Sequence, residues 1–121
     1  MELAEFEQVV VEVIAELPEV FRRHLAHVEV IVEERPNRDI RQRTGIKPWQ
    51  TVYGLYDGVP ITERSSDFAA PPDTIYIFRM PLERDFRTPT ALREEIRRTV
   101  LHEIAHHFGI SDERLHELGA Y

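Results

Sequence analysis

The stretch TPTALREEIRRTVLHEIAHHFG, residues 88–109, decides the fold of this 121-residue chain. It opens with Thr88, whose side chain can cap the free N–H groups at the start of a helix. Pro89 follows, and proline is favoured in the first turn of a helix. It closes at Gly109, because glycine readily takes the left-handed conformation that ends many helices. No other proline or glycine lies between these signals. The stretch therefore predicts one long helix through Phe108.

Two stripes of opposite character run along the predicted helix. Ile96, Val100 and Ile104 recur every four residues and form an apolar stripe that should face the core. His102 and His106 lie on nearly the opposite side of the helix, about 40° apart around its axis. We therefore expect the two histidines to face a cleft, where both imidazoles can reach one metal ion.

The residues around these histidines predict a catalytic zinc site. Glu103 is offset from His102 by about 100°, so it can act on a water molecule without binding the metal. Gly109 permits a sharp chain reversal, after which Asp112 can return to supply a third ligand. Three protein ligands with a fourth position open are typical of catalytic zinc. The alternative is a solvated helix face, which glycine and aspartate at these fixed offsets disfavour.

The other histidines near this motif are predicted to have different roles. His107 lies about 140° from His102, back on the apolar stripe, and is predicted to be a half-buried structural residue. His116 is predicted to lie on the surface of a short last helix, which Ser111 or Asp112 caps.

Periodicities elsewhere predict an α+β fold. Apolar residues recur every three or four positions over residues 3–17, which predicts an N-terminal helix that Pro18 ends. Residues 27–34 alternate between apolar and polar side chains and predict a strand. Residues 74–80 are apolar on both faces, which predicts a strand covered on both sides and ended by Pro81.

The remaining segments are predicted to form a hairpin and two loops. Residues 51–63 carry Asp57 and Gly58 between apolar runs, and both residue types tolerate the positive φ of a tight hairpin turn. Residues 35–50 and 65–73 are polar and contain prolines, so we expect loops there. The first of these loops begins with the basic sequence RPNRDIRQRTGIK. It could hold an anionic partner, but composition alone favours a solvated loop.

Composition limits the class of protein. A chain of 121 residues should form one domain, residues 1–121. Lys and Arg total 15 against 22 acidic residues, and a net charge of −7 argues against binding to nucleic acid or membrane surfaces. Cysteine is absent, so histidines and carboxylates must hold any metal. The acidic start and the lack of a long apolar run predict a cytoplasmic protein.

The sequence HEIAHHFGISD matches the HExxHxxGxxD signature of zincin metallopeptidases whose third ligand is an aspartate. The segments LPEVFRRHLAHVEVIVEE, GLYDGVPITERS, TIYIFRMPL and RTVLHEIAHHFGISDERLHELG are similar to the small bacterial zincin-like metallopeptidase family. The resemblance covers nearly the whole chain. It implies a minimal zincin-like α+β fold with an N-terminal helix, a small mixed and mostly antiparallel sheet, an active-site helix and a short C-terminal helix.

The resemblance also implies the chemistry. His102, His106 and Asp112 would bind Zn²⁺, and Glu103 would act as general base in the hydrolysis of peptide bonds. The partner would be a peptide or protein substrate, bound as an added strand at the sheet edge that residues 51–64 or 74–80 supply.

Three tyrosines, Tyr53, Tyr56 and Tyr121, are candidates for stabilising the oxyanion. Larger metzincins have a third histidine ligand and a methionine turn, whereas only nine residues, none of them Met, follow Asp112 here. We therefore expect a shallow cleft and weak activity.

Two other functions remain open. The chain could be a non-catalytic metal-binding or interaction module of zincin fold. It also resembles, in the spacing of its metal ligands, the bacterial rRNA-maturation endoribonucleases, which have three histidines at these offsets. That family lacks the His–Glu pair, and the net charge of −7 disfavours an RNA substrate.

Overall fold

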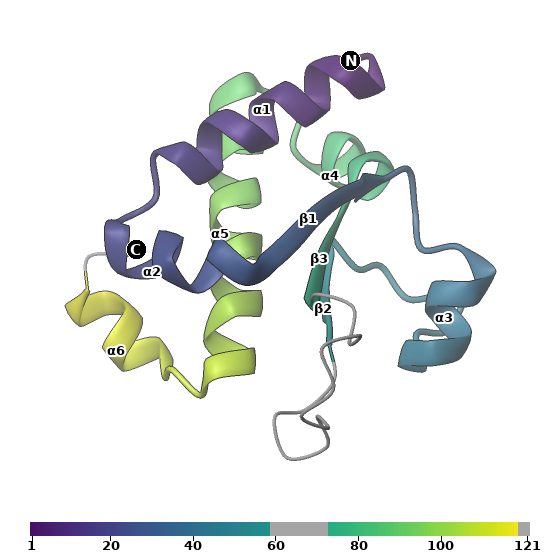
Figure 1. The fold of residues 1–121 in the computed structure, drawn as a ribbon. Coiled ribbons are helices and arrows are strands. Elements are labelled where there is room, and N and C mark those ends of the chain that lie inside the picture. Colours follow the sequence, from purple (N-terminus) through teal and green to yellow (C-terminus); the bar gives the residue numbers. More distant parts are fainter. Residues whose placement is uncertain (59–72, 119–121) are drawn as a thin grey trace.

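The computed structural model of the protein describes residues 1–58 and 73–118. In chain order the elements are α1 (Leu3–Ala15), α2 (Glu19–His24), the 3₁₀ helix η1 (Leu25–His27), β1 (Val28–Glu33), α3 (Arg38–Thr44), β2 (Gly54–Asp57), β3 (Asp73–Phe78), α4 (Arg79–Asp85), α5 (Pro89–Phe108) and α6 (Asp112–Glu117). Figure 1 shows the long α5 between the sheet and the helices α2 and α6. The fold is the small α+β arrangement that the sequence predicted.

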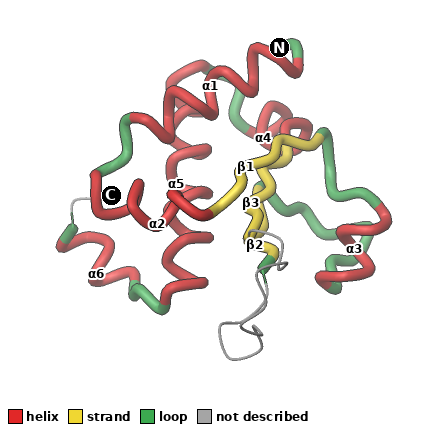
Figure 2. Tube along the Cα trace, in the orientation of Figure 1, coloured by secondary structure: helices red, strands yellow, loops and turns green. Residues whose placement is uncertain are grey.

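The described strands form one mixed sheet with the order β1-β3-β2. β1 runs parallel to β3, and β2 runs antiparallel to it. Figure 2 shows the strands between α5 on one side and α3 on the other. The central position of β3 explains its apolar character, because Ile75 and Ile77 join the main core while Phe78, on the opposite face, is also buried.

The main core lies where α1 and α5 pack on the sheet. Buried side chains of α1, β3 and α5 share one cluster, to which the valines of β1 contribute from its inner face. Its largest fully buried members include Phe6, Ile77, Ile96 and Ile104. Burying a side chain of this size contributes roughly 1.5–3 kcal/mol. The predicted apolar stripe of α5 therefore faces the core, as expected.

The predicted ends of α5 are confirmed. The Thr88 side chain accepts a hydrogen bond from the Ala91 N–H at 3.1 Å, and Pro89 is the first helical residue. Gly109 ends the helix with φ of 69°, in the left-handed region. Ser111 caps α6, where its hydroxyl accepts from the Arg114 N–H.

One predicted loop contains a helix. Residues 38–44 form α3, because the Asn37 side chain accepts from the Ile40 N–H at 2.8 Å and Gly45 ends the helix with φ of 80°. Ile40 is its one buried residue. One buried apolar residue does not produce a periodic pattern in the sequence. The prediction of a loop over residues 35–50 was therefore wrong for residues 38–44, which form α3.

One predicted boundary also differs, and one helix was not predicted. The strand expected over residues 74–80 ends at Phe78, and α4 begins at Arg79. Pro81 lies in the first turn of that helix, where its missing N–H costs no hydrogen bond. Residues 19–24 form α2, for which we had no prediction.

The tight turn predicted at Asp57 and Gly58 is not formed. Asp57 belongs to β2 and pairs with Thr74, and neither turn residue has positive φ. The remainder of the predicted hairpin, residues 59–63, and most of the predicted loop at 65–73 lie outside the described residues. Within the described residues, no helix combines the length and apolar character that a membrane crossing requires.

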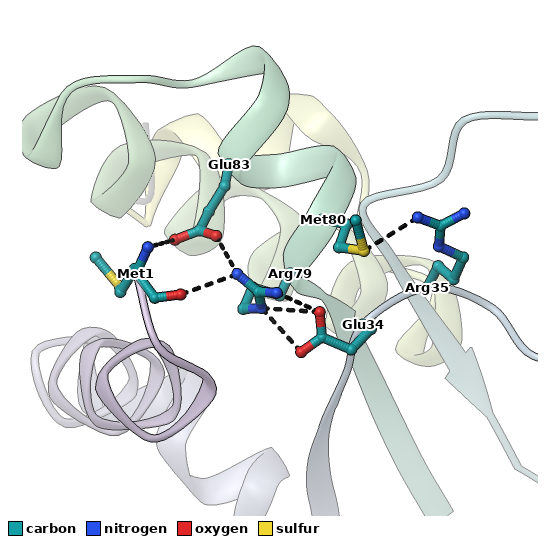
Figure 3. A network of polar contacts seen from close by, with 6 residues as sticks. All are labelled: Met1, Glu34, Arg35, Arg79, Met80 and Glu83. Atoms are coloured by element: carbon teal, nitrogen blue, oxygen red, sulfur yellow. Dashed lines mark hydrogen bonds and ion pairs between the residues drawn. The ribbon is translucent and has the colours of Figure 1, made fainter.

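Arg79 joins the N-terminus, the end of β1 and α4 (Figure 3). Its guanidinium donates to the Met1 carbonyl at 2.9 Å and to the carboxylates of Glu34 and Glu83. The hydrogen bond from Arg79 is the largest cause that lowers the pKa of Glu34. A carboxyl group whose pKa is lowered by folding stabilises the protein above its unfolded pKa, and this contribution is lost as the pH falls through the folded value.

We therefore expect Arg79→Gln to lower the melting temperature at pH 7 and to lower it less at an acidic pH, because the contribution of Glu34 is lost as the pH falls through its lowered pKa. Thermal unfolding at both values measures the difference. Arg114→Gln, which removes an exposed ion pair with Glu117, is the control and should have little effect at either pH. An equal effect of Arg79→Gln at both values would contradict this account.

Candidate active site

β2 and α5 lie unusually close together, and this contact determines where Glu103 lies relative to β2. A Cβ atom at Gly54 would lie 2.5 Å from the Thr99 Cγ2 and 3.0 Å from the Tyr76 carbonyl oxygen. Only glycine fits this distance. Glu103 lies one helical turn beyond Thr99, about 6 Å along the axis, and Tyr56 lies two strand residues beyond Gly54, about 6.7 Å along the strand. The matched spacing brings Glu103 beside Tyr56.

This packing makes a stability prediction. Gly54→Ala should destabilise the fold by about 1–3 kcal/mol, because the new methyl group overlaps Thr99. Thr99→Ser removes the Cγ2 methyl and should partly restore the stability of Gly54→Ala. Denaturant unfolding of both single variants and the double variant measures the coupling. Strictly additive effects would show that this contact does not set the spacing.

Glu103 is held by the backbone of β2. The Tyr56 N–H donates to the Glu103 Oε2 at 3.0 Å. Burial raises the pKa of Glu103, while the Tyr56 N–H and the nearby His106 and His102 act in the opposite direction. A carboxylate with a raised pKa accepts protons more readily near neutral pH, as a general base requires.

The Tyr56 N–H belongs to the outer side of β2. The Tyr53 carbonyl accepts from the Phe78 N–H of β3, so the alternate residues Gly54 and Tyr56 direct their backbone groups away from β3. Among the described strands, β3 is central and β1 and β2 form the edges. The predicted edge at residues 74–80 is therefore excluded, and β2 is the edge beside Glu103.

The chain reversal after α5 occurs as the sequence predicted. Gly109 is left-handed, and the Ile110 N–H donates to the Ala105 carbonyl at 2.8 Å. Asp112, the first residue of α6, thereby returns toward α5, and its Oδ1 lies 4.0 Å from the Nε2 of His102. The side chains are accessible, with exposed fractions of 83% for Asp112 and 45% for His102.

The fit of these residues to a metal ion can be judged from this distance. Two zinc ligands at tetrahedral geometry lie about 3.3–3.5 Å apart, so small rotations of His102 and Asp112 suffice to share an ion. His106 is exposed on the last turn of α5. In the described part of the chain, no three His, Asp or Glu side chains converge as a complete metal site. The donor types, and the spacing of His102 and His106 by one helical turn, are compatible with zinc.

His107 occupies a different environment from the two predicted ligands. Its ring stacks on Tyr56 with centroids 3.9 Å apart, and its Nε2 lies 3.5 Å from the Asp73 Oδ2. The Tyr56 hydroxyl donates to the same Asp73 oxygen at 2.7 Å. Only 17% of the His107 side chain is exposed, which agrees with the predicted half-buried position. Asp73 was not among the predicted site residues, because the sequence placed it at the end of a loop.

A hollow of about 260 Å³ lies between α5 and the segment that enters β2. The residues that line it are Thr51, Val52, Tyr53, Gly54, Glu95, Arg98, Thr99, His102 and Glu103. Of the four predicted site residues, His102 and Glu103 thus face this space, whereas His106 and Asp112 do not line it. The arrangement can bring a bound group next to a carboxylate and an imidazole.

The tyrosines considered for the oxyanion have other contacts. The Tyr53 hydroxyl donates to the Asp85 Oδ2 at 2.6 Å, and the Tyr56 hydroxyl donates to Asp73. Tyr121 lies outside the described residues. His116 is exposed on α6, as predicted.

The comparisons with known proteins identify the family. A search of curated proteins finds no match to the chain. A sequence profile described as zincin-like metallopeptidase matches residues 25–120, which include the whole described sheet, α5 and α6. The match covers well over half of the sequence. The chain therefore belongs to the zincin-like metallopeptidase family.

Proposed function

We propose that this protein is a zinc-dependent peptidase in which His102, His106 and Asp112 bind the metal and Glu103 is the general base. The observation that carries the proposal is the position of Glu103. Its carboxylate lies in a hollow beside His102 and accepts a hydrogen bond from the Tyr56 N–H at the outer edge of β2. Membership of a metallopeptidase family supports the same role.

The residues would divide the work of hydrolysis between them. When bound, a zinc ion supplies Lewis-acid chemistry, which polarises a carbonyl oxygen and acidifies water. Glu103 takes a proton from the attacking water and passes it to the nitrogen of the leaving amine. The Tyr56 N–H holds Oε2 of this carboxylate, which leaves Oε1 to carry the proton. The side chain is thereby oriented before the substrate binds.

The edge of β2 gives the substrate a place to bind. The backbone of Gly54 faces outward on the same side as the Tyr56 N–H. An extended peptide can pair with such an edge through main-chain hydrogen bonds. We place the scissile bond over the hollow, where Glu103 and His102 meet this edge.

A peptide-library cleavage assay tests the proposal. Purified protein is incubated with the library, and products are identified by mass spectrometry with and without a chelator. We expect weak cleavage that the chelator removes and added zinc restores. Retention of zinc without any cleavage would favour the non-catalytic module. Salt-sensitive RNA binding with RNA cleavage would favour the endoribonuclease.

The role of His107 gives a separate prediction. His107→Phe should retain the zinc content of the wild type, because His107 contacts Tyr56 and Asp73 rather than the proposed ligands. Phenylalanine preserves the stacking on Tyr56. Metal analysis of the folded variant measures this, and loss of zinc would place His107 among the ligands.

A further inference from the structure

A second hollow, of about 440 Å³, lies beside α3 and the start of α4. Its lining contains several cations and no Asp or Glu, although the chain as a whole carries a charge of −7. The residues that matter most here are Arg35, Arg41, Lys47, Trp49, Thr51 and Val52. A cationic surface on an acidic protein is selective, because the rest of the molecule repels anions.

Three of these cations have no ion pair within residues 1–58 and 73–118. Arg35 contacts the sulfur of Met80 at 3.1 Å rather than a carboxylate, as Figure 3 shows. Neither Arg41 nor Lys47 has an ion pair with a described residue, although Arg41 is half-buried. A half-buried guanidinium without a carboxylate partner is a ready site for an anion, since Arg binds carboxylates in a bidentate manner.

The acidic residues close to this hollow form ion pairs with arginines other than Arg35 and Arg41. One of them, Asp85, pairs with Arg84, which lines the hollow and is thereby partly neutralised. Glu34 and Glu83 both bind Arg79 (Figure 3), and Glu34 also attracts its chain neighbour Arg35 electrostatically. Asp39 of α3 binds Arg43 at 3.1 Å. Arg41 and Lys47 are therefore left without a carboxylate partner among the described residues, whereas Arg35 and Arg84 are partly neutralised by Glu34 and Asp85.

Trp49 adds an apolar surface next to the cations. It is 78% exposed, the most exposed of the large hydrophobic side chains in the described residues. The turn that carries it is ordered by two hydrogen bonds: Gln50 N–H to the Lys47 carbonyl at 3.1 Å, and Lys47 N–H to the Gln50 side chain at 2.7 Å. Lys47 and Trp49 thus lie together on one hydrogen-bonded turn.

The cationic hollow adjoins the candidate active site. Thr51 and Val52 line both hollows, and the chain continues from them into β2. A peptide paired with the edge of β2 can therefore extend past Val52 and Thr51 into the cationic hollow. We propose that this hollow is a specificity subsite that binds acidic side chains of the peptide substrate. The inference rests on the proposed peptidase function for the identity of its ligand.

An acidic peptide suits this site better than a nucleic acid. The three cations are confined to one hollow, which matches one or two carboxylates. A nucleic acid carries a continuous row of phosphates that would extend onto the acidic surface around it. The flat face of Trp49 covers the aliphatic part of a glutamate or the backbone beside it.

Trp49 also supplies the measurement, because it is the only tryptophan of the chain. Its fluorescence is followed while the protein is titrated with a peptide that has adjacent glutamates in an Ala–Ser background. A peptide with glutamines in their place is the reference. We expect saturable binding of the glutamate peptide and about tenfold weaker binding of the glutamine peptide, as lost charge-assisted hydrogen bonds predict.

Variants locate the binding. Arg41→Gln and Lys47→Gln, tested separately, should each weaken binding of the glutamate peptide by about tenfold and remove the preference over glutamine. Arg22→Gln is the matched control, since Arg22 is exposed on α2, on the opposite side of the molecule from α3 in Figure 1. It should bind like the wild type. Circular dichroism establishes that every variant is folded.

The outcomes separate this inference from the proposed function, because the titration requires no catalysis. Selective binding of the glutamate peptide without cleavage would support the subsite and count against the peptidase. Zinc-dependent cleavage with equal binding of both peptides would overturn the subsite and leave the peptidase standing. Binding of a single-stranded RNA oligonucleotide in preference to the glutamate peptide would also overturn it.

Discussion

Glu103→Gln should lower the rate of peptide hydrolysis by about 10²–10⁴-fold, the usual contribution of a general base. Glutamine has the shape of glutamate but cannot accept the proton of the attacking water. Its side-chain oxygen can still accept the hydrogen bond from the Tyr56 N–H, so the local fold should be retained. Zinc content should also be unchanged, because Glu103 is not a proposed ligand.

The experiment compares initial rates on a peptide that the wild type cleaves, near neutral pH. Glu94→Gln is the matched control, because Glu94 is exposed on the same helix and does not line the hollow. It should hydrolyse the peptide at the wild-type rate. Wild-type activity in Glu103→Gln would refute the assigned mechanism.

Loss of either proposed histidine ligand should have a large effect on zinc binding. We expect His102→Ala or His106→Ala to abolish zinc retention and Asp112→Ala to weaken it severely. Replacing a residue that only supports a ligand typically costs about 10–100-fold in affinity, and removing a ligand should cost more. The expected content of the wild type is about one zinc ion per chain.

Metal analysis after extensive dialysis measures these contents. His116→Ala is the control, because His116 is exposed on α6 and is not a proposed ligand. Full zinc occupancy in Asp112→Ala, together with its loss in Glu113→Ala or His116→Ala, would show that the third ligand is wrongly assigned.

The parts of the fold that follow from local rules could be predicted from the sequence. The ends of α5 depend on Thr88, Pro89 and Gly109, whose effects act over one helical turn. The spacing of His102 and His106 is also a property of one helix. The return of Asp112 toward His102 needed only the left-handed glycine and a short helix after it.

Other parts depend on contacts between distant segments. α3 is stabilised by its cap at Asn37 and by one buried isoleucine, Ile40. The polar composition of the segment therefore gave no sign of a helix. The hydrogen bond between Tyr56 and Glu103 joins residues 47 positions apart. It exists because Gly54 lets β2 approach Thr99, a requirement that no single segment reveals.

The cationic hollow illustrates the same limit. Residues 35–50 were predicted to form a solvated loop, because the composition of a segment does not show which of its cations lack a carboxylate partner. Whether a cation is neutralised depends on which carboxylate reaches it, and Arg79, Arg43 and Arg84 form ion pairs with the acidic residues nearby. The tertiary arrangement therefore decides which arginines face the hollow.

The most direct test of the central claim is a zinc titration of metal-free protein in which bound zinc and the rate of peptide hydrolysis are measured in the same samples. The account predicts that the rate rises in proportion to bound zinc and saturates near one ion per chain, with Glu103→Gln binding equally but remaining inactive. Full zinc occupancy without hydrolysis of any library peptide would contradict it.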